Sequence, residues 1–142
     1  MSRITLEQAN AVIAGAFATA REMALKPLGV AVLDAGGHLI AWQRQDGAST
    51  GRLQLAVGKA SGALFLGISS RKIGDMAGER PAFLASLAPI APGGVVPAAG
   101  GVIVVDANGH AIGAVGISGD LSDKDEACTL AGIAAAGLTA QA

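Results

Sequence analysis

Lys59 is the residue whose surroundings in the sequence best suit chemistry. It is the only charged residue between Arg52 and Arg71, in a stretch rich in apolar and small side chains. Burial among apolar side chains lowers the pKa of an amine, and a neutral amine can act as a base or a nucleophile. Alternatively, the aliphatic stem of Lys59 lies on apolar surface while its amine reaches solvent or pairs with a carboxylate. The sequence alone leaves both interpretations open.

A second candidate site is the segment 116–126, which leads from a predicted strand into a predicted helix. Glycines here allow backbone N–H groups to converge on a carboxylate or another anion. The acidic residues that follow could act as partner acids for Lys59, or they could cap the helix themselves and leave no room for a ligand. The candidate ligand-binding residues are Gly116, Ser118 and Gly119, and the candidate catalytic acids are Asp125 and Glu126.

His38 and His110 are the only histidines, and each follows a predicted turn. Either imidazole could ligate a metal ion or a haem iron, and either could equally be an ordinary solvated side chain. Arg44, on the predicted strand after the first turn, is a further candidate ligand-binding residue. The chain has no CxxC, HExxH or serine nucleophile elbow, and no P-loop, so none of these common catalytic or nucleotide-binding motifs applies.

The elements that must position these residues include a repeated unit. Residues 29–40 read GVAVLDAGGHLI and residues 101–112 read GVIVVDANGHAI, with eight of the twelve positions identical. The pairs Asn108-Gly109 and Gly36-Gly37 favour two-residue turns, because these residue types tolerate positive φ. The repeat therefore predicts two β-hairpins, the first with strands near 29–34 and 38–44 and the second over 101–117.

Helical periodicity surrounds the hairpins. A capping box at Thr5 and Gln8 begins a predicted helix over 5–25. Apolar residues cover most of the circumference of a second predicted helix, over 50–69, which predicts that this helix is buried on several sides. Ser122 and Asp125 have a spacing like that of a capping box at the start of the last helix. The remaining expected elements are the helix over 50–69, a short helix and a loop over 71–88, an uncharged Pro/Gly-rich connection over 89–100, and a helix over 122–140.

This order of elements predicts one domain over residues 1–142 with an α+β fold. Two consecutive hairpins pair readily into one antiparallel sheet, and helices then cover its faces. The expected architecture is therefore an α/β/α sandwich. A Rossmann fold is not expected, since no GxGxxG sits between a strand and a helix.

The amino-acid composition indicates which classes of partner this chain can bind. Apolar residues make up 51% of the chain and charged residues 15%, against about 25% charged in ordinary soluble domains. Burial between subunits accounts for such an apolar surplus, which predicts a homo-oligomer. A net charge of −1 and 3% aromatic residues argue against nucleic acid binding. The longest uncharged run, 81–105, contains prolines and glycines that exclude a membrane-spanning helix.

The same reasoning predicts a cytoplasmic protein. The chain begins MSRITLEQAN, with Glu7 inside the first apolar pattern, which differs from a signal peptide. Cys128 is the only cysteine, so the chain forms no internal disulfide.

Several segments together resemble the GlcG/HbpS haem-degrading family, which is related to the C-terminal domain of PduO-type proteins. They are VAVLDAGGHLIAWQRQDGA (30–48), AVGKASGA (56–63), PGGVVPAAGGVIVVDANGHAIGAVGISG (92–119) and DKDEACTLAGIAAA (123–136). The resemblance implies a profilin-like fold, with a central antiparallel sheet between helices. It also implies a compact homo-oligomer, often an octamer, and haem as a cofactor of some members. The positions that match the family pattern are Lys59, Gly116, Ser118, Gly119, Asp125 and Glu126.

Some haem-binding relatives use a histidine in the first helix, whereas this chain has no histidine before His38. We therefore expect a cytoplasmic, homo-oligomeric small-ligand-binding protein of the GlcG/HbpS type, with haem as the candidate ligand. The alternative is an enzyme that acts on a small carbonyl or hydroxy-acid metabolite through Lys59 and Glu126. A purely structural subunit is the third hypothesis.

Overall fold

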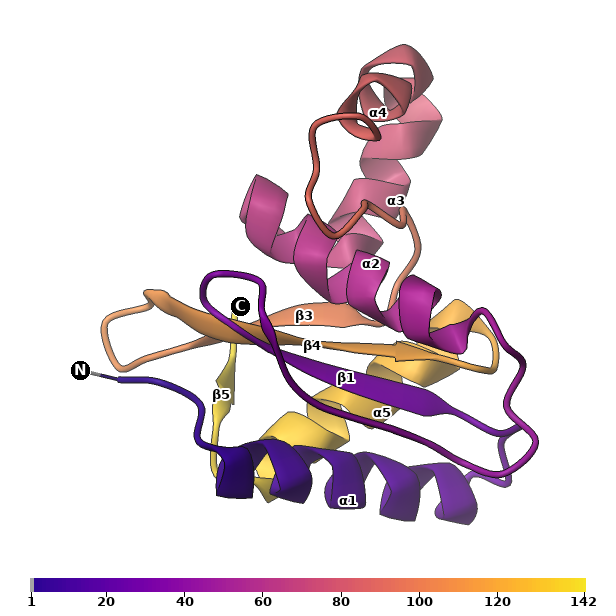
Figure 1. Ribbon diagram of the computed structural model, residues 1–142, viewed down its shortest axis with the longest axis vertical. Coiled ribbons are helices and arrows are strands. Elements are labelled where there is room, and N and C mark those ends of the chain that lie inside the picture. Colours follow the sequence, from indigo (N-terminus) through magenta and orange to yellow (C-terminus); the bar gives the residue numbers. More distant parts are fainter. Residues whose placement is uncertain (1) are drawn as a thin grey trace.

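The computed structural model describes residues 2–142 and consists of a sheet between two helical layers (Figure 1). On one face lie α1 (Leu6–Glu22) and α5 (Ser122–Ala135), and on the other lies α2 (Arg52–Leu66). The strands are β1 (Gly29–Asp34), β2 (Leu39–Arg44), β3 (Gly101–Val105), β4 (Ala111–Ser118) and β5 (Thr139–Ala140). The predicted α+β sandwich is therefore confirmed.

The sheet has the order β2-β1-β4-β3-β5, and every pair of neighbours is antiparallel. The two predicted hairpins, β1–β2 and β3–β4, are joined through β1 and β4, with Gly29 opposite Ser118. Each hairpin has a register shift near its turn, between Val32 and Leu33 in the first and between Val104 and Val105 in the second. The sequence repeat is thus also a structural repeat, since both hairpins share the register shift near the turn.

Alternation along the strands divides the core in two. Val30, Val32, Val115 and Ile117 face α1 and α5, where they join a large cluster of buried apolar side chains. The opposite face, which includes Leu33 and Ala114, packs against α2. The predicted capping box is present at the start of α1, where Thr5 Oγ1 accepts the Gln8 N–H and Gln8 Oε1 accepts the Thr5 N–H.

The buried face of α2 is built from small residues. Side chains on Gly58 and Gly62 would collide with Val96 and Val95, so these glycines allow the connection 89–100 to lie directly over the helix. The helix is buried against the sheet and under the connection, in line with the predicted burial on several sides, while Leu55 stays 37% exposed and Phe65 42% exposed. Small residues of α2 make the closest approach to the sheet, and among its large apolar side chains Leu64 also packs against sheet residues.

Two further predictions need correction. The segment 71–88 forms two helices, α3 (Ser70–Glu79) and α4 (Pro81–Leu87), that project from the sheet as an arm (Figure 1). The last helix ends at Ala135, not near residue 140, because Gly137 adopts a left-handed φ of 73° and reverses the chain. The following residues form β5 on the edge of the sheet beside β3.

Candidate functional site

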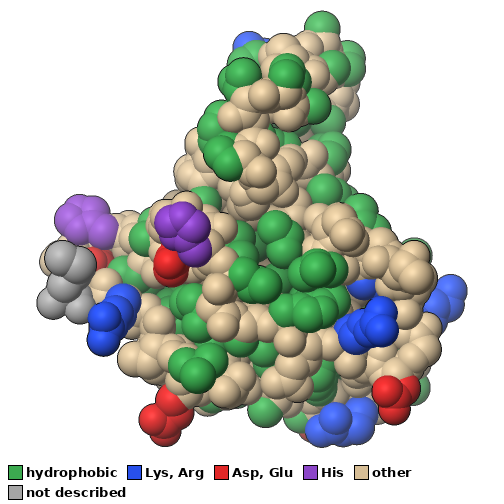
Figure 2. Space-filling view, viewed as in Figure 1, with side chains coloured by type: hydrophobic (Ala, Val, Ile, Leu, Met, Phe, Trp, Pro, Cys, Tyr) green, Lys and Arg blue, Asp and Glu red, His purple; other side chains and the backbone are tan. Residues whose placement is uncertain are grey.

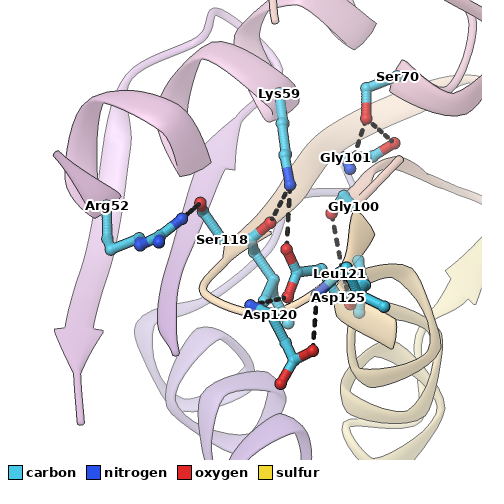
Figure 3. Close-up of polar contacts among 11 residues, drawn as sticks. Arg52, Lys59, Ser70, Gly100, Gly101, Ser118, Asp120, Leu121 and Asp125 are labelled. Carbon is cyan, nitrogen blue, oxygen red and sulfur yellow. Dashed lines mark hydrogen bonds and ion pairs between the residues drawn. The ribbon is translucent and has the colours of Figure 1, made fainter. Parts of the chain in front are cut away.

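Lys59 and Asp125 form a buried ion pair between α2 and α5 (Figure 3). Their side chains are 4% and 1% exposed, and Lys59 Nζ lies 3.2 Å from Asp125 Oδ2. Lys59 Nζ also donates to the backbone oxygen of Ile117 at 2.9 Å, near the end of β4. The second oxygen of Asp125 accepts the Asp120 N–H at 2.9 Å. The pair therefore links both helical layers to the same end of the sheet.

Burial shifts both members of this pair toward their neutral forms. Loss of solvent lowers the pKa of Lys59, and Asp125 opposes that change. Loss of solvent likewise raises the pKa of Asp125, against the effects of the Asp120 N–H and of Lys59. Each charge is thus compensated by the other and by backbone groups. The Lys59 amine therefore makes its hydrogen bonds within the protein, to Ile117 and Asp125.

The predicted anion cradle at 116–119 is filled by the chain itself. A side chain on Gly116 would collide with the Ala56 carbonyl, and one on Gly119 would collide with the Pro27 carbonyl. These glycines therefore serve close packing. Ser118 is 2% exposed, and its hydroxyl accepts a hydrogen bond from Arg52 Nη1 at 3.0 Å (Figure 3).

The predicted cap of the last helix is wrong in detail. The N-cap position of α5 is Leu121, without a side-chain cap, so Ser122 already lies inside the helix. Asp125 faces Lys59 and the turn before the helix, where it accepts the Asp120 N–H. The Asp125 carboxylate thus accepts a backbone N–H just before α5, in place of the capping box predicted with Ser122.

The structure separates the other predicted site residues from the pair. Glu126 binds Arg71 of α3, with Arg71 Nε 2.9 Å and 3.1 Å from its two carboxylate oxygens, and it makes no contact with Lys59. Arg44 lies exposed at the end of the edge strand β2. Arg52 was missed as a site residue, although its spacing of two helical turns from Lys59 places both side chains on one face of α2.

His38 and His110 occupy equivalent turns, and Figure 2 shows both imidazoles standing out from the surface. Each side chain is 81% exposed. His38 Nδ1 lies 3.3 Å from Asp34 Oδ1, whereas His110 Nδ1 lies 3.9 Å from Asp106 Oδ2. Each imidazole therefore has a carboxylate beside it, at a shorter distance in the first turn.

Only the first of these two histidines lines the cavity of about 340 Å³ between the first hairpin turn, α2 and the Pro/Gly-rich connection. Leu64 and Phe65 of α2 form its apolar wall together with Pro92 of the connection, and Ser61 supplies a hydroxyl. This cavity brings together three segments that are far apart in the sequence, and it lies outside the predicted Lys59 site.

Neither a cluster of metal-ligating side chains nor a membrane-spanning helix occurs in residues 2–142. Among residues 2–142, no three His, Cys, Asp or Glu side chains gather closely enough to hold a metal ion by themselves. Within the same residues, no helix combines the length and apolar character needed to cross a bilayer.

The architecture defines an α+β sandwich in which helices cover both faces of an antiparallel sheet. The model of the HbpS-like haem-degrading protein family matches residues 4–134, so the chain belongs to this family. The resemblance seen in the sequence is thereby confirmed. No curated protein sequence matches the chain.

Several solved structures share this fold, among them the following three. PduOC in its haem complex has a TM-score of 0.86 and 24% identity, covering 99% of this chain and 100% of that one. A doubly substituted HbpS of Streptomyces reticuli has a TM-score of 0.80 and 28% identity, covering 94% of this chain and 87% of that one. Protein ORFY of Klebsiella pneumoniae has a TM-score of 0.85 and 24% identity, covering 96% and 93%.

Proposed function

We propose that this protein binds haem in the cavity beside His38. The observation that carries the proposal is that an exposed imidazole lines a cavity with apolar side chains on its wall, in a member of the HbpS-like family. The structural relative PduOC, which has a haem complex, supports the choice of ligand. Haem-binding sites combine an iron-ligating side chain with apolar surface for the porphyrin, and this cavity offers both.

The residues around the cavity fit a haem better than a bare metal ion. A haem brings its own ring nitrogens, so one protein side chain such as His38 is enough to ligate the iron. Phe65, Leu64 and Pro92 present apolar surface on which a flat macrocycle can lie. When bound, the haem would supply iron-centred redox chemistry. The chain itself would contribute the ligand, the apolar contacts and partial exclusion of water.

We also propose that the protein works as a homo-oligomer. Large apolar side chains remain exposed, and Figure 2 shows apolar side chains gathered below the projecting arm. The exposed ones include Leu6, Leu39, Phe65, Ile90 and Leu121, between 42% and 63% exposed. Native mass spectrometry at several protein concentrations tests this point, and a monomer throughout would contradict it. The octamer and the cytoplasmic location stay predictions.

A titration with haemin tests the function. We expect a saturable shift of the Soret band for the native protein, a large loss of affinity for His38→Ala and unchanged binding for His110→Ala. The second variant is a matched control, because both histidines are 81% exposed in equivalent turns. Absence of a saturable shift would refute haem binding. Equal effects of the two substitutions would place the ligand elsewhere.

The enzymatic alternative has no support in these comparisons. Glu126 pairs with Arg71, and the Lys59 amine is buried against Ile117 and Asp125. A functional role for Lys59, Asp125 and Ser118 stays a prediction.

A further inference from the structure

The two histidine turns hold their carboxylates in the same way. In the first turn, Asp34 Oδ1 accepts the N–H groups of Gly36 and His38, both at 2.9 Å. In the second turn, Asp106 Oδ1 accepts the N–H groups of Asn108 and His110, again at 2.9 Å. Because two backbone N–H groups fix each carboxylate, its position in the turn is set independently of the imidazole.

The imidazoles nevertheless differ in their distance from these carboxylates. The closest distance from Nδ1 to a carboxylate oxygen is 3.3 Å for His38 and 3.9 Å for His110. Both histidine side chains are 81% exposed, whereas Asp34 is 43% exposed and Asp106 is 19% exposed. From the aspartate to the histidine, the two turns differ in sequence at one residue, Gly36 in the first and Asn108 in the second.

This third residue of the turn lies beside the imidazole in the first copy. A Cβ placed on Gly36 would lie only 3.0 Å from both Nδ1 and Cε1 of His38, closer than such contacts normally come. The His38 ring therefore occupies space that a side chain at position 36 would take. The equivalent residue in the second turn is Asn108, which has a Cβ at this place. Gly36 thus leaves room beside Asp34 for the His38 ring, whereas the second turn has the Cβ of Asn108 at the equivalent position.

We propose that Gly36 and Asp34 are positioning residues for His38, which hold its Nδ1–H toward the carboxylate and leave Nε2 unprotonated. A neutral imidazole that donates from Nδ1 has its free electron pair on Nε2, the form that ligates iron. The difference between Gly36 and Asn108 then makes only the first of two otherwise matching turns ready to bind a haem. This inference deepens the proposed haem binding and rests on it for its purpose, although the imidazole geometry exists without haem.

The tautomer of each histidine in the haem-free protein tests the positioning directly. Nitrogen-15 NMR of the imidazoles is recorded at about pH 8, above the ordinary histidine pKa of about 6.5. We expect His38 to be mainly protonated on Nδ1, and to shift toward the Nε2–H form in Gly36→Asn and in Asp34→Asn. The reciprocal variant Asn108→Gly should move His110 toward the Nδ1–H form. These turns are exposed, and Gly36 lies outside the positive-φ region, so Gly36→Asn should fold normally.

Haemin affinity provides the second measurement. Loss of the partner that orients a metal-ligating histidine typically weakens binding 10- to 100-fold, so Gly36→Asn should lower the affinity by about 10-fold or more. Asn108→Gly is the control and should leave it unchanged. A His38 that is mainly Nε2–H in the native protein, or a tautomer that ignores Gly36→Asn, would overturn the inference. The expected tautomers with no haemin binding would uphold the positioning and refute the proposed function instead.

Discussion

Removal of one member of the Lys59–Asp125 pair should destabilise the protein severely. In Asp125→Ala, the Lys59 ammonium stays buried with the Ile117 backbone oxygen as its remaining hydrogen-bond partner. Breaking a buried ion pair in this way typically costs about 3–5 kcal/mol. The Asp120 N–H also loses its acceptor, which adds about 1 kcal/mol. The expected loss is a large share of the roughly 5–15 kcal/mol by which domains are stable.

A double-mutant cycle measures the interaction between Lys59 and Asp125 separately from the cost of burying each side chain. Lys59→Met, Asp125→Ala and the double variant are unfolded in urea at one fixed protein concentration, since an oligomer gains stability with concentration. The double variant contains no unpaired buried charge, so we expect it to lose less than the sum of the single losses. The coupling free energy should be about 2 kcal/mol or more.

The exposed pair between Arg71 and Glu126 is the matched control. Arg71 is 49% exposed, so solvent screens this pair, and Arg71→Ala should cost about 0–1 kcal/mol. Losses below about 1 kcal/mol for both single variants of the buried pair, with no coupling between them, would refute its burial. The same result would remove the role of Lys59 in joining α2 to the end of the sheet.

Three further predictions follow from individual residues. Gly100→Ala should destabilise the protein by about 2 kcal/mol or more in urea, because φ is +131° and a Cβ would lie 2.9 Å from Lys59 Nζ; a neutral effect would contradict the close packing. Burial raises the pKa of the Cys128 thiol to about 11, so a disulfide reagent at about pH 8 should label it slowly in the native state and rapidly in urea. Rapid native labelling would show that the thiol is accessible. Backbone N–H groups, first that of His110, hold the pKa of Asp106 below its unfolded value of 3.8. The Asp106 carboxylate therefore stabilises the fold fully above pH 3.8. This stabilisation is lost as the pH falls through the lower pKa of the folded state. The stability difference between the native protein and Asp106→Ala should therefore shrink below pH 3.8, and a constant difference across that range would contradict the turn geometry.

Much of the fold is predictable from the repeat. The two copies of the hairpin sequence combine β-branched runs with turn residues, so local preference and pairing agree. The end of the last helix was harder to predict, because apolar residues continue at helical spacing beyond Ala135 and only Gly137 signals the reversal. The strand β5 has two residues and depends on the edge of β3, so no local pattern could predict it.

The candidate site was only partly predictable. An isolated Lys59 indicated burial, but the choice between Asp125 and Glu126 depends on the rotation of α5, since adjacent helical residues point in different directions. Asp125 faces Lys59 and Glu126 faces Arg71. The cavity beside His38 could not be predicted, because its walls come from three segments whose meeting depends on how α2 and the connection pack.

Lys59 and the apolar wall of the cavity beside His38 lie on the same helix, α2, so the contacts of Lys59 bear on the position of that wall. The sheet-facing residues of α2 are mostly small, so they offer few interlocking side chains to fix the helix along its own axis. The directional contacts of Lys59 with Ile117 and Asp125 supply that constraint. Phe65, which forms a wall of the cavity, lies between one and two turns further along the helix. A polar group buried at the middle of α2 thereby helps to fix the position of the apolar wall near the C-terminal end of the helix.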